Sequence, residues 1–136
     1  HKHTPEIEMA LGLFAGKKAI VSFTPHLVPA VRGIHICCSA QARTGLKAEE
    51  LSQVYEEAYQ HEFFVKLSRV RAGTKEVRGS NYVSLTPSLD EHAGRVIVTC
   101  VLDNLVKGAA GQAIQNANLA CGLDETLGLE GLGLYP

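Results

Sequence analysis

The sequence predicts an α+β domain in which a mixed, largely antiparallel sheet carries helices packed on one face. Residues 34–41 alternate between two kinds of side chain with the period of a strand. Residues 95–102 are almost continuously apolar, which is typical of a strand covered on both faces. Between them, residues 47–60 carry an apolar stripe at helical spacing. Strands and helices that succeed one another in this order favour the α+β class.

The first predicted element is a helix that begins at Thr4. Thr4 suits the N-cap position, Pro5 suits the first helical position, and Glu6 places an acid in the first turn. Apolar residues then recur at helical spacing from Ile7 onward, and Gly16 ends the helix.

Two strands and the clearest helix follow. Residues 19–23 predict a short strand, which Pro25 and Pro29 interrupt because proline lacks a backbone donor. A longer strand is expected over residues 31–41, followed by a turn and then the helix over 47–60.

The second half of the chain predicts three more strands and a helix. These elements are a strand over 63–67, a strand over 77–86 interrupted by a glycine, a polar turn over 87–94, the apolar strand over 95–102 and a helix over 109–121. A small two-layer domain should leave one sheet face in water, so the apolar strand indicates that another subunit or a further domain covers the second face.

Charge and cysteine content exclude several classes of function. The net charge is -1 with no run of one sign, which argues against a nucleic-acid surface or a basic membrane patch. No apolar stretch approaches the length of a membrane span, and no secretory signal pattern occurs. The four cysteines lack a CxxC pair and zinc-ligand spacing, so they predict reduced core residues of a cytoplasmic protein without a metal site.

Two groups of polar residues could carry acid/base chemistry or hold a cofactor. His1, His3 and Glu6 can form an acid/base cluster because imidazole titrates near neutrality, or they are an ordinary terminus with Glu6 at the helix dipole. Asn104 and Gly108 lie in a Gly/Ala-rich strand-to-helix turn. Its free N–H groups suit an anion or a carboxamide, or the turn is simply a tight crossover.

Two further groups could bind substrate. Arg32 can hold a carboxylate or phosphate through two parallel hydrogen bonds, or it is a surface arginine. Arg78, Ser80 and Asn81 beside Gly79 could line a polar pocket, or form a bulged strand with ordinary turn residues.

Taken together and in chain order, these segments resemble the N-acetyl-gamma-glutamyl-phosphate reductase family. The resemblance rests on HKHTPEIE at 1–8, VSFTPHLVP at 21–29 with Arg32 and Gly33 after it, VRGSN at 77–81, DNLVKGAAGQA at 103–113 and LACGLDET at 119–126. Each motif alone is modest, but their common order makes the set specific.

The resemblance implies an NADPH-dependent reductase of arginine biosynthesis that converts N-acetyl-gamma-glutamyl phosphate to N-acetylglutamate semialdehyde through a cysteine thioester. It also implies an N-terminal Rossmann domain for NADP and a C-terminal α+β domain that builds the oligomer interface. Residues 1–136 would form the latter domain, with residues 105–121 packed against the NADP-binding domain. The family's Pro-Gly-Cys nucleophile motif does not occur here, so the isolated chain is expected to be an inactive C-terminal fragment.

Transferred by position, the resemblance assigns individual roles. His1 matches the acid/base histidine, assisted by His3 and Glu6, and Asn104 with Gly108 would contact the nicotinamide. The weaker candidates for the substrate's carboxylate or phosphate are Arg32, Arg78, Ser80 and Asn81.

The expected partners are a small acyl phosphate and further copies of the chain, in a homodimer or tetramer formed through the sheet. No metal, nucleic acid or membrane is expected. Two alternatives remain open: a related lysine-pathway reductase acting on a carrier-linked aminoadipyl phosphate, and a non-catalytic oligomerisation module.

Overall fold

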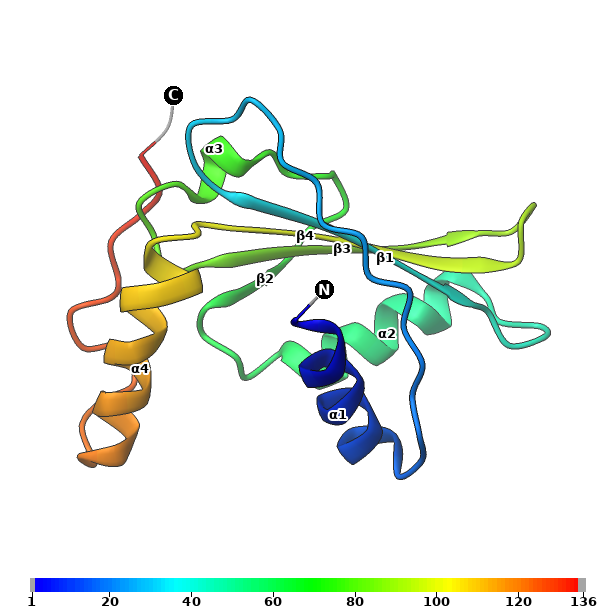
Figure 1. Cartoon of the computed structure of the whole chain (residues 1–136), viewed down its shortest axis with the longest axis horizontal. Helices are drawn as coiled ribbons and strands as arrows, with labels where there is room; N and C mark the ends of the chain where they lie inside the picture. Colours follow the sequence, from blue (N-terminus) through cyan, green and yellow to red (C-terminus); the bar gives the residue numbers. More distant parts are fainter. Residues whose placement is uncertain (1, 135–136) are drawn as a thin grey trace. The chain divides into compact units, whose positions relative to one another are not determined.

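A computed structural model describes residues 2–134 of the chain. The chain divides into two compact units, His1–Ala30 and Val31–Pro136 (Figure 1). The first unit holds one helix and an irregular segment, and the second holds the whole sheet.

The first unit is built on helix α1, Thr4–Ala15. The predicted cap is wrong by one residue: His3 is the N-cap, and its carbonyl accepts the N–H of Ile7 at 3.0 Å. Pro5 allows this because a residue without an N–H fits either early helical position. Gly16, with a φ of 63°, ends the helix as predicted.

The strand predicted over residues 19–23 is absent from the described first unit. The apolar run finds no neighbouring strand there, and the N–H of Val21 instead donates to Oε1 of Glu8 at 2.9 Å. The side chain of Glu8 therefore accepts the hydrogen bond that a neighbouring strand would otherwise accept.

The second unit contains a four-stranded sheet in the order β1-β4-β3-β2. The pairs β1/β4 and β3/β4 are antiparallel, and β2/β3 is parallel. The mixed, largely antiparallel sheet of the prediction is thereby confirmed. Its strands are β1 Ile34–Gln41, β2 Val65–Leu67, β3 Val83–Asp90 and β4 Arg95–Leu102.

Helices and loops cover the two sheet faces unequally. Helix α2, Ala48–Tyr59, packs on β2 and β3, and the single turn α3, Thr74–Val77, contacts β4 (Figure 1). The segment before α3 crosses the face opposite α2, where the hydroxyl of Thr86 donates to the carbonyl of Val70 at 3.3 Å. The buried apolar side chains are Leu51, Phe64, Val77, Val83, Val101 and Leu129.

The sheet is incompletely covered within this chain. In β4 only Thr99 and Val101 are buried, and every residue of β1 is exposed. The strand that the sequence predicts to be dry on both faces is therefore only half-buried. Any further cover for this part of the sheet has to come from outside the second unit.

Strand β3 begins and ends later than predicted. Val77 belongs to α3, and Pro87 lies inside the strand, opposite Val98 of β4. Strand β2 ends at Leu67, opposite Leu85, so β3 has a neighbour on one side only at Pro87. A proline is tolerated there because an edge position needs one donor fewer.

The predicted helix over 109–121 corresponds to two elements. A π-helix, η1 Val106–Ala110, leads directly into α4, Gly111–Ala120. The helical path therefore starts earlier than predicted, close to the end of β4.

Candidate functional site

The carboxylate of Asp103, directly after β4, is the centre of a buried polar cluster. Its side chain is fully buried, and Oδ2 accepts the N–H of Gly79 at 2.6 Å and lies 2.8 Å from Nε of Arg32. Oδ1 accepts the N–H groups of Leu105 at 2.8 Å and Val106 at 2.9 Å. One carboxylate thus joins the end of β4, the start of η1, the loop before β3 and the segment before β1.

These contacts keep Asp103 ionised. Burial alone would raise the pKa of this carboxyl, but hydrogen bonds from Gly79, Val106 and Leu105 and the guanidinium of Arg32 outweigh it. Together they lower the pKa of Asp103 from 3.8 to about 2. Asp103 therefore keeps its negative charge, paired with Arg32, at any pH near neutrality.

Asn104, the next residue along the chain, holds the segment before β1 in place. Its Oδ1 accepts the N–H of Gly33 at 2.7 Å. Because a backbone N–H only donates, the atom facing Gly33 is the amide oxygen, and Nδ2 is turned away as a donor. Gly33 has a φ of 105°, and an added Cβ would lie 2.6 Å from the Cβ of Thr74, so glycine suits this close approach.

The guanidinium of Arg32 is paired through Nε, while Nη1 and Nη2 are unpaired among residues 2–134. Its side chain is 27% exposed, and Nε faces Asp103. Among residues 2–134, Nη1 and Nη2 have no hydrogen-bond partner. The arrangement leaves two donors of the guanidinium for an anion.

Gly108 and Gly111 flank the end of the π-helix but differ in their surroundings. Gly108 is exposed, and its N–H donates to the carbonyl of Asp103 at 2.9 Å. Gly111 is buried, and a Cβ there would meet Oδ1 of Asn81 and lie 2.7 Å from Cγ1 and 2.8 Å from the carbonyl oxygen of Val106. The sequence marks the whole Gly/Ala run without singling out Gly111, since the obstructing side chain comes from the distant loop before β3.

Gly111→Ala should therefore destabilise the chain by about 1–3 kcal/mol, the usual cost of overpacking. Gly108→Ala is the matched control, because its Cβ would come no closer than 3.4 Å to Asp103 and Leu102. Urea unfolding followed by circular dichroism would measure both variants. Equal losses of stability in the two would contradict the packing assigned to Gly111.

A second polar network lies between η1 and α4. Oε1 of Gln115 accepts from Nδ2 of Asn81 at 2.9 Å and from Nζ of Lys107 at 2.7 Å, and its Nε2 donates to Glu125. Burial lowers the pKa of Lys107, while the carboxylates of Glu125 and Glu62 oppose that shift. The network ties α4 to the strand region and to the segment that follows the helix.

The predicted substrate group at 78–81 occupies two environments. Arg78 is exposed, and its carbonyl accepts the N–H of Leu134 at 2.7 Å. Ser80 and Asn81 are buried, and the Ser80 hydroxyl donates to the carbonyl of Val77 at 2.8 Å. Ser80 and Asn81 therefore face inward, and their assignment to substrate stays a prediction from the resemblance.

The predicted acid/base group lies in the first unit. His1 falls outside the described residues. The ring of His3 lies 6.5 Å from that of Phe23, centroid to centroid, which brings the histidine motif beside the segment at 21–29. Glu6 is exposed in the first turn of α1, and its catalytic role also stays a prediction.

Among the four cysteines only Cys100 is shielded. Burial raises its pKa to about 11, with a further rise from Cys38, which makes this thiol a poor nucleophile. Cys37, Cys38 and Cys121 are exposed, so the prediction of core cysteines is wrong for these three. For Cys37 and Cys38 the reason is that β1 is an edge strand with little cover.

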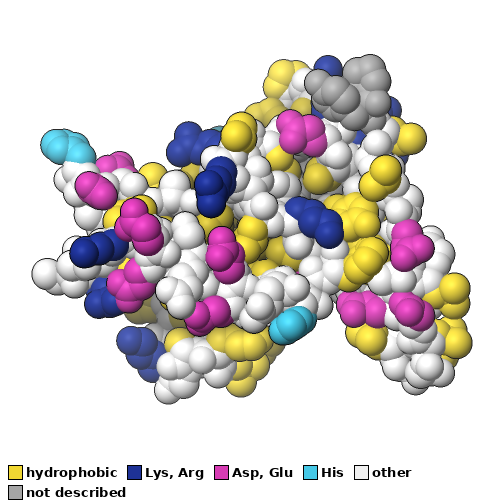
Figure 2. All heavy atoms as spheres, turned by 180° about the vertical axis from the view of Figure 1, so that it is seen from behind, with side chains coloured by type: hydrophobic (Ala, Val, Ile, Leu, Met, Phe, Trp, Pro, Cys, Tyr) yellow, Lys and Arg dark blue, Asp and Glu magenta, His cyan; other side chains and the backbone are white. Residues whose placement is uncertain are grey.

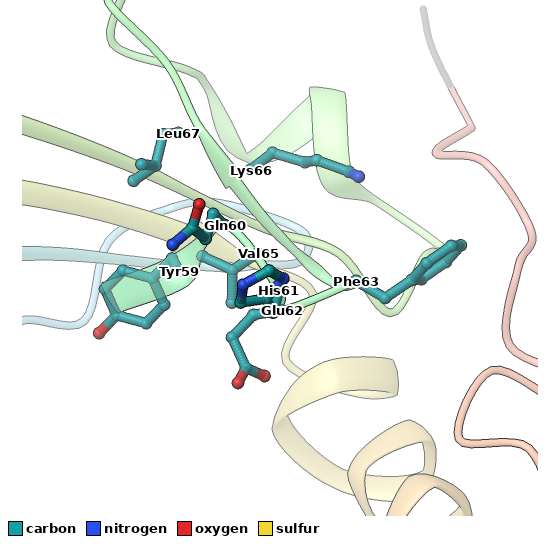
Figure 3. Close-up of a pocket in the computed structure, with 8 residues that line it drawn as sticks. All are labelled: Tyr59, Gln60, His61, Glu62, Phe63, Val65, Lys66 and Leu67. Atoms are coloured by element: carbon teal, nitrogen blue, oxygen red, sulfur yellow. The ribbon is translucent and has the colours of Figure 1, made fainter. Parts of the chain in front are cut away.

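Two shallow hollows lie elsewhere on the second unit. The larger, about 430 Å³, follows the end of α2 and is lined by residues from Tyr59 to Leu67 (Figure 3). The smaller, about 290 Å³, lies between the turn at 41–46 and residues 89–94. None of the predicted site residues within 2–134 lines either hollow, so the candidate site is the polar cluster around Asp103.

Neither a metal centre nor a membrane span is found in the part of the chain that the structure describes. No three metal-binding side chains gather within residues 2–134. No helix in that range has the length and apolar character needed to cross a bilayer.

Comparison with known proteins identifies the family. The family described as semialdehyde dehydrogenase, dimerisation domain, matches residues 1–104. Relatives named N-acetyl-gamma-glutamyl-phosphate reductase are 48% identical in Pelobacter propionicus, 49% in Pseudarthrobacter chlorophenolicus and 45% in Bacillus cereus. These matches cover 99–100% of this chain but only 40% of each relative, so the chain spans about 40% of their length. The chain belongs to the family of semialdehyde dehydrogenase dimerisation domains.

Proposed function

We propose that the chain is the dimerisation and acid/base part of an NADPH-dependent reductase that converts N-acetyl-gamma-glutamyl phosphate to N-acetylglutamate semialdehyde. The observation that carries the proposal is the 45–49% identity to reductases of that name over the whole chain. The thiol that forms the thioester would come from outside residues 1–136, so the isolated chain would not turn over substrate.

Within that reaction, His1 would move the protons. It would accept the proton of the attacking thiol and, after hydride transfer, donate a proton to the alkoxide of the thiohemiacetal. That oxygen would lose the proton again as the carbon–sulfur bond breaks, the thiolate leaves and the aldehyde forms. His3 would assist from the N-cap of α1, and Glu6 would orient one of the imidazole rings.

Asn104 and Gly108 would contact the nicotinamide. NADPH, when bound, supplies the hydride. The residues fit a carboxamide, because Nδ2 of Asn104 is turned away from its bond to Gly33 and the backbone at Gly108 is exposed. The rest of the nucleotide site would lie in an N-terminal domain, with residues 105–121 packed against it.

Arg32 would bind the carboxylate or phosphate of the substrate. The free edge of its guanidinium supports this role, and exposed Arg78 next to Gly79 lies on a loop bound to the same carboxylate. Ser80 and Asn81 belong to the same proposed substrate group, and both are buried within this chain.

The sheet would form the interface of a homodimer or tetramer. Strand register places Cys37, Thr99 and Thr86 in one row on the face opposite α2. Residues 68–77 cross that face near Thr86, but Cys37 is exposed. A second copy of the sheet can cover this part, in a cytoplasmic enzyme that needs no metal.

Cys37→Arg should therefore break the oligomer, since it would bury an unpaired charge. Cys121→Arg is the matched control, because Cys121 is an equally exposed cysteine after α4. Light scattering under reducing conditions should give a monomer for the first and the wild-type mass for the second. An unchanged mass for Cys37→Arg would place the interface elsewhere.

The test of the proposed function is NADPH oxidation by the full-length protein, followed by absorbance. N-acetyl-gamma-glutamyl phosphate should support turnover, and a carrier-linked aminoadipyl phosphate should not. Figure 2 shows acidic and basic side chains mixed over much of one face and acidic side chains alone at its lower right, whereas an acidic carrier protein would need a basic surface. Turnover of the carrier-linked substrate alone would favour the lysine-pathway alternative.

A further inference from the structure

We propose that Asp103 is a positioning residue of the reductase, which holds Arg32 and Asn104 so that their free nitrogen atoms are available to the substrate anion and the nicotinamide. The inference rests on the proposed function. It names a residue that the motif-based assignment of roles leaves out.

Burial excludes a direct role for Asp103. The carboxylate is fully buried, and its contacts are with Arg32, Gly79, Leu105 and Val106, all within the domain. Any effect of Asp103 on a ligand must pass through these neighbours.

The contacts form two consecutive clamps on one segment. Asp103 holds the side chain of Arg32, and Asn104 holds the backbone of Gly33. Residues 103 and 104 are adjacent, and so are residues 32 and 33. A shift of the buried carboxylate would therefore move the side chain of Arg32 and the backbone of Gly33 together. The bonds from Leu105 and Val106 fix the same carboxylate to the start of η1, so the turn at Gly108 moves with them.

The negative charge, and not only the shape, is needed. Arg32 has a long side chain that would otherwise sample many rotamers, and the carboxylate orients it by Nε alone. All four groups that face the carboxylate are hydrogen-bond donors, from Gly79 and Arg32 on one oxygen and from Leu105 and Val106 on the other. An amide at position 103 would have to point its NH₂ group at one of these two pairs of donors. Asp103→Asn therefore removes the orienting charge and adds a donor–donor conflict.

The test is a double-mutant cycle in the full-length protein, with KM for the acyl phosphate, KM for NADPH, kcat and thermal unfolding measured for each variant. Asp103→Asn should raise KM for the acyl phosphate by about tenfold or more, the value of one charge-assisted contact. When Arg32→Ala is already present, Asp103→Asn should raise the KM for the acyl phosphate by less than about threefold. The reason is that Asp103 can no longer act through the side chain of Arg32. Equal factors in both backgrounds would mean a merely structural role and would overturn the proposal.

Arg32 provides a second measurement that does not depend on a buried substitution. Arg32→Lys and Arg32→Ala should raise KM for the acyl phosphate, with KM for NADPH nearly unchanged. Arg71→Ala is the control, since Arg71 is an exposed arginine in the loop before α3. If the wild-type protein reduces the acyl phosphate but the Arg32 variants keep its KM, this inference fails while the proposed function stands. If the wild-type protein does not reduce it, the proposed function itself fails.

Discussion

Asp103→Ala should lower the free energy of unfolding of the chain by about 3–5 kcal/mol, the cost of removing one partner from a buried ion pair. The change leaves the Nε of Arg32 without its carboxylate and removes the acceptor of the N–H groups of Gly79, Leu105 and Val106. Urea unfolding at neutral pH would measure the loss.

The matched control is Asp90→Ala. Asp90 is the last residue of β3, and its Oδ1 accepts a single backbone N–H, that of Ala93 at 2.9 Å. One turn-forming contact should be worth about 1 kcal/mol. A similar loss in the two variants would show that the cluster around Asp103 does not have the stabilising role assigned to it.

The stability that Asp103 contributes should also depend on pH. Its pKa is lowered on folding, so the contribution is complete above the ordinary value of 3.8 and is lost as the pH falls toward about 2. Between pH 5 and pH 2 the free energy of unfolding should fall more steeply for the wild-type chain than for Asp103→Asn, as urea unfolding at each pH would measure. An equal fall in the two proteins would contradict the lowered pKa of Asp103.

The elements that the sequence predicts well are those whose own side chains form a clear pattern, a continuous apolar run in one case and an apolar stripe at helical spacing in the other. Residues 95–102 form β4 with the predicted bounds, and α2 lies within the predicted 47–60. In both segments the pattern of side chains within the element is enough to specify it. The elements predicted poorly depend on neighbours: the run at 19–23 has no partner strand in its unit, and Pro87 is accommodated only because β2 has already ended.

The same distinction applies to the candidate site. Asn104 was predicted because it stands in a recognisable strand-to-helix motif. Asp103 begins the same motif, but the motif does not mark it as the centre of a cluster, since two of its partners, Gly79 and Arg32, are distant in sequence. Ser80 and Asn81 look like pocket residues in a polar motif, and only the packing of η1 and α4 reveals that they are buried.

His1→Ala in the full-length protein should lower kcat by about 10²–10⁴-fold, the usual contribution of a positioned acid/base group. The reaction needs a proton removed from the thiol and a proton supplied to the alkoxide of the thiohemiacetal, and imidazole exchanges protons near neutral pH. The pH profile of kcat should lose the limb that the wild-type protein shows near neutral pH. Binding of NADPH should be unaffected, because the proposed nicotinamide contacts lie at Asn104 and Gly108.

The control for His1 is another histidine of the same unit. His26 is exposed, and its Nδ1 lies 3.0 Å from the carbonyl oxygen of Thr24, so His26→Ala removes an imidazole without touching the motif at 1–8. That variant should keep the wild-type kcat, whereas His3→Ala should fall between the two because His3 assists from the N-cap of α1. A wild-type rate in His1→Ala together with a large loss in His3→Ala would move the acid/base role to His3, while leaving the proposed reaction itself intact.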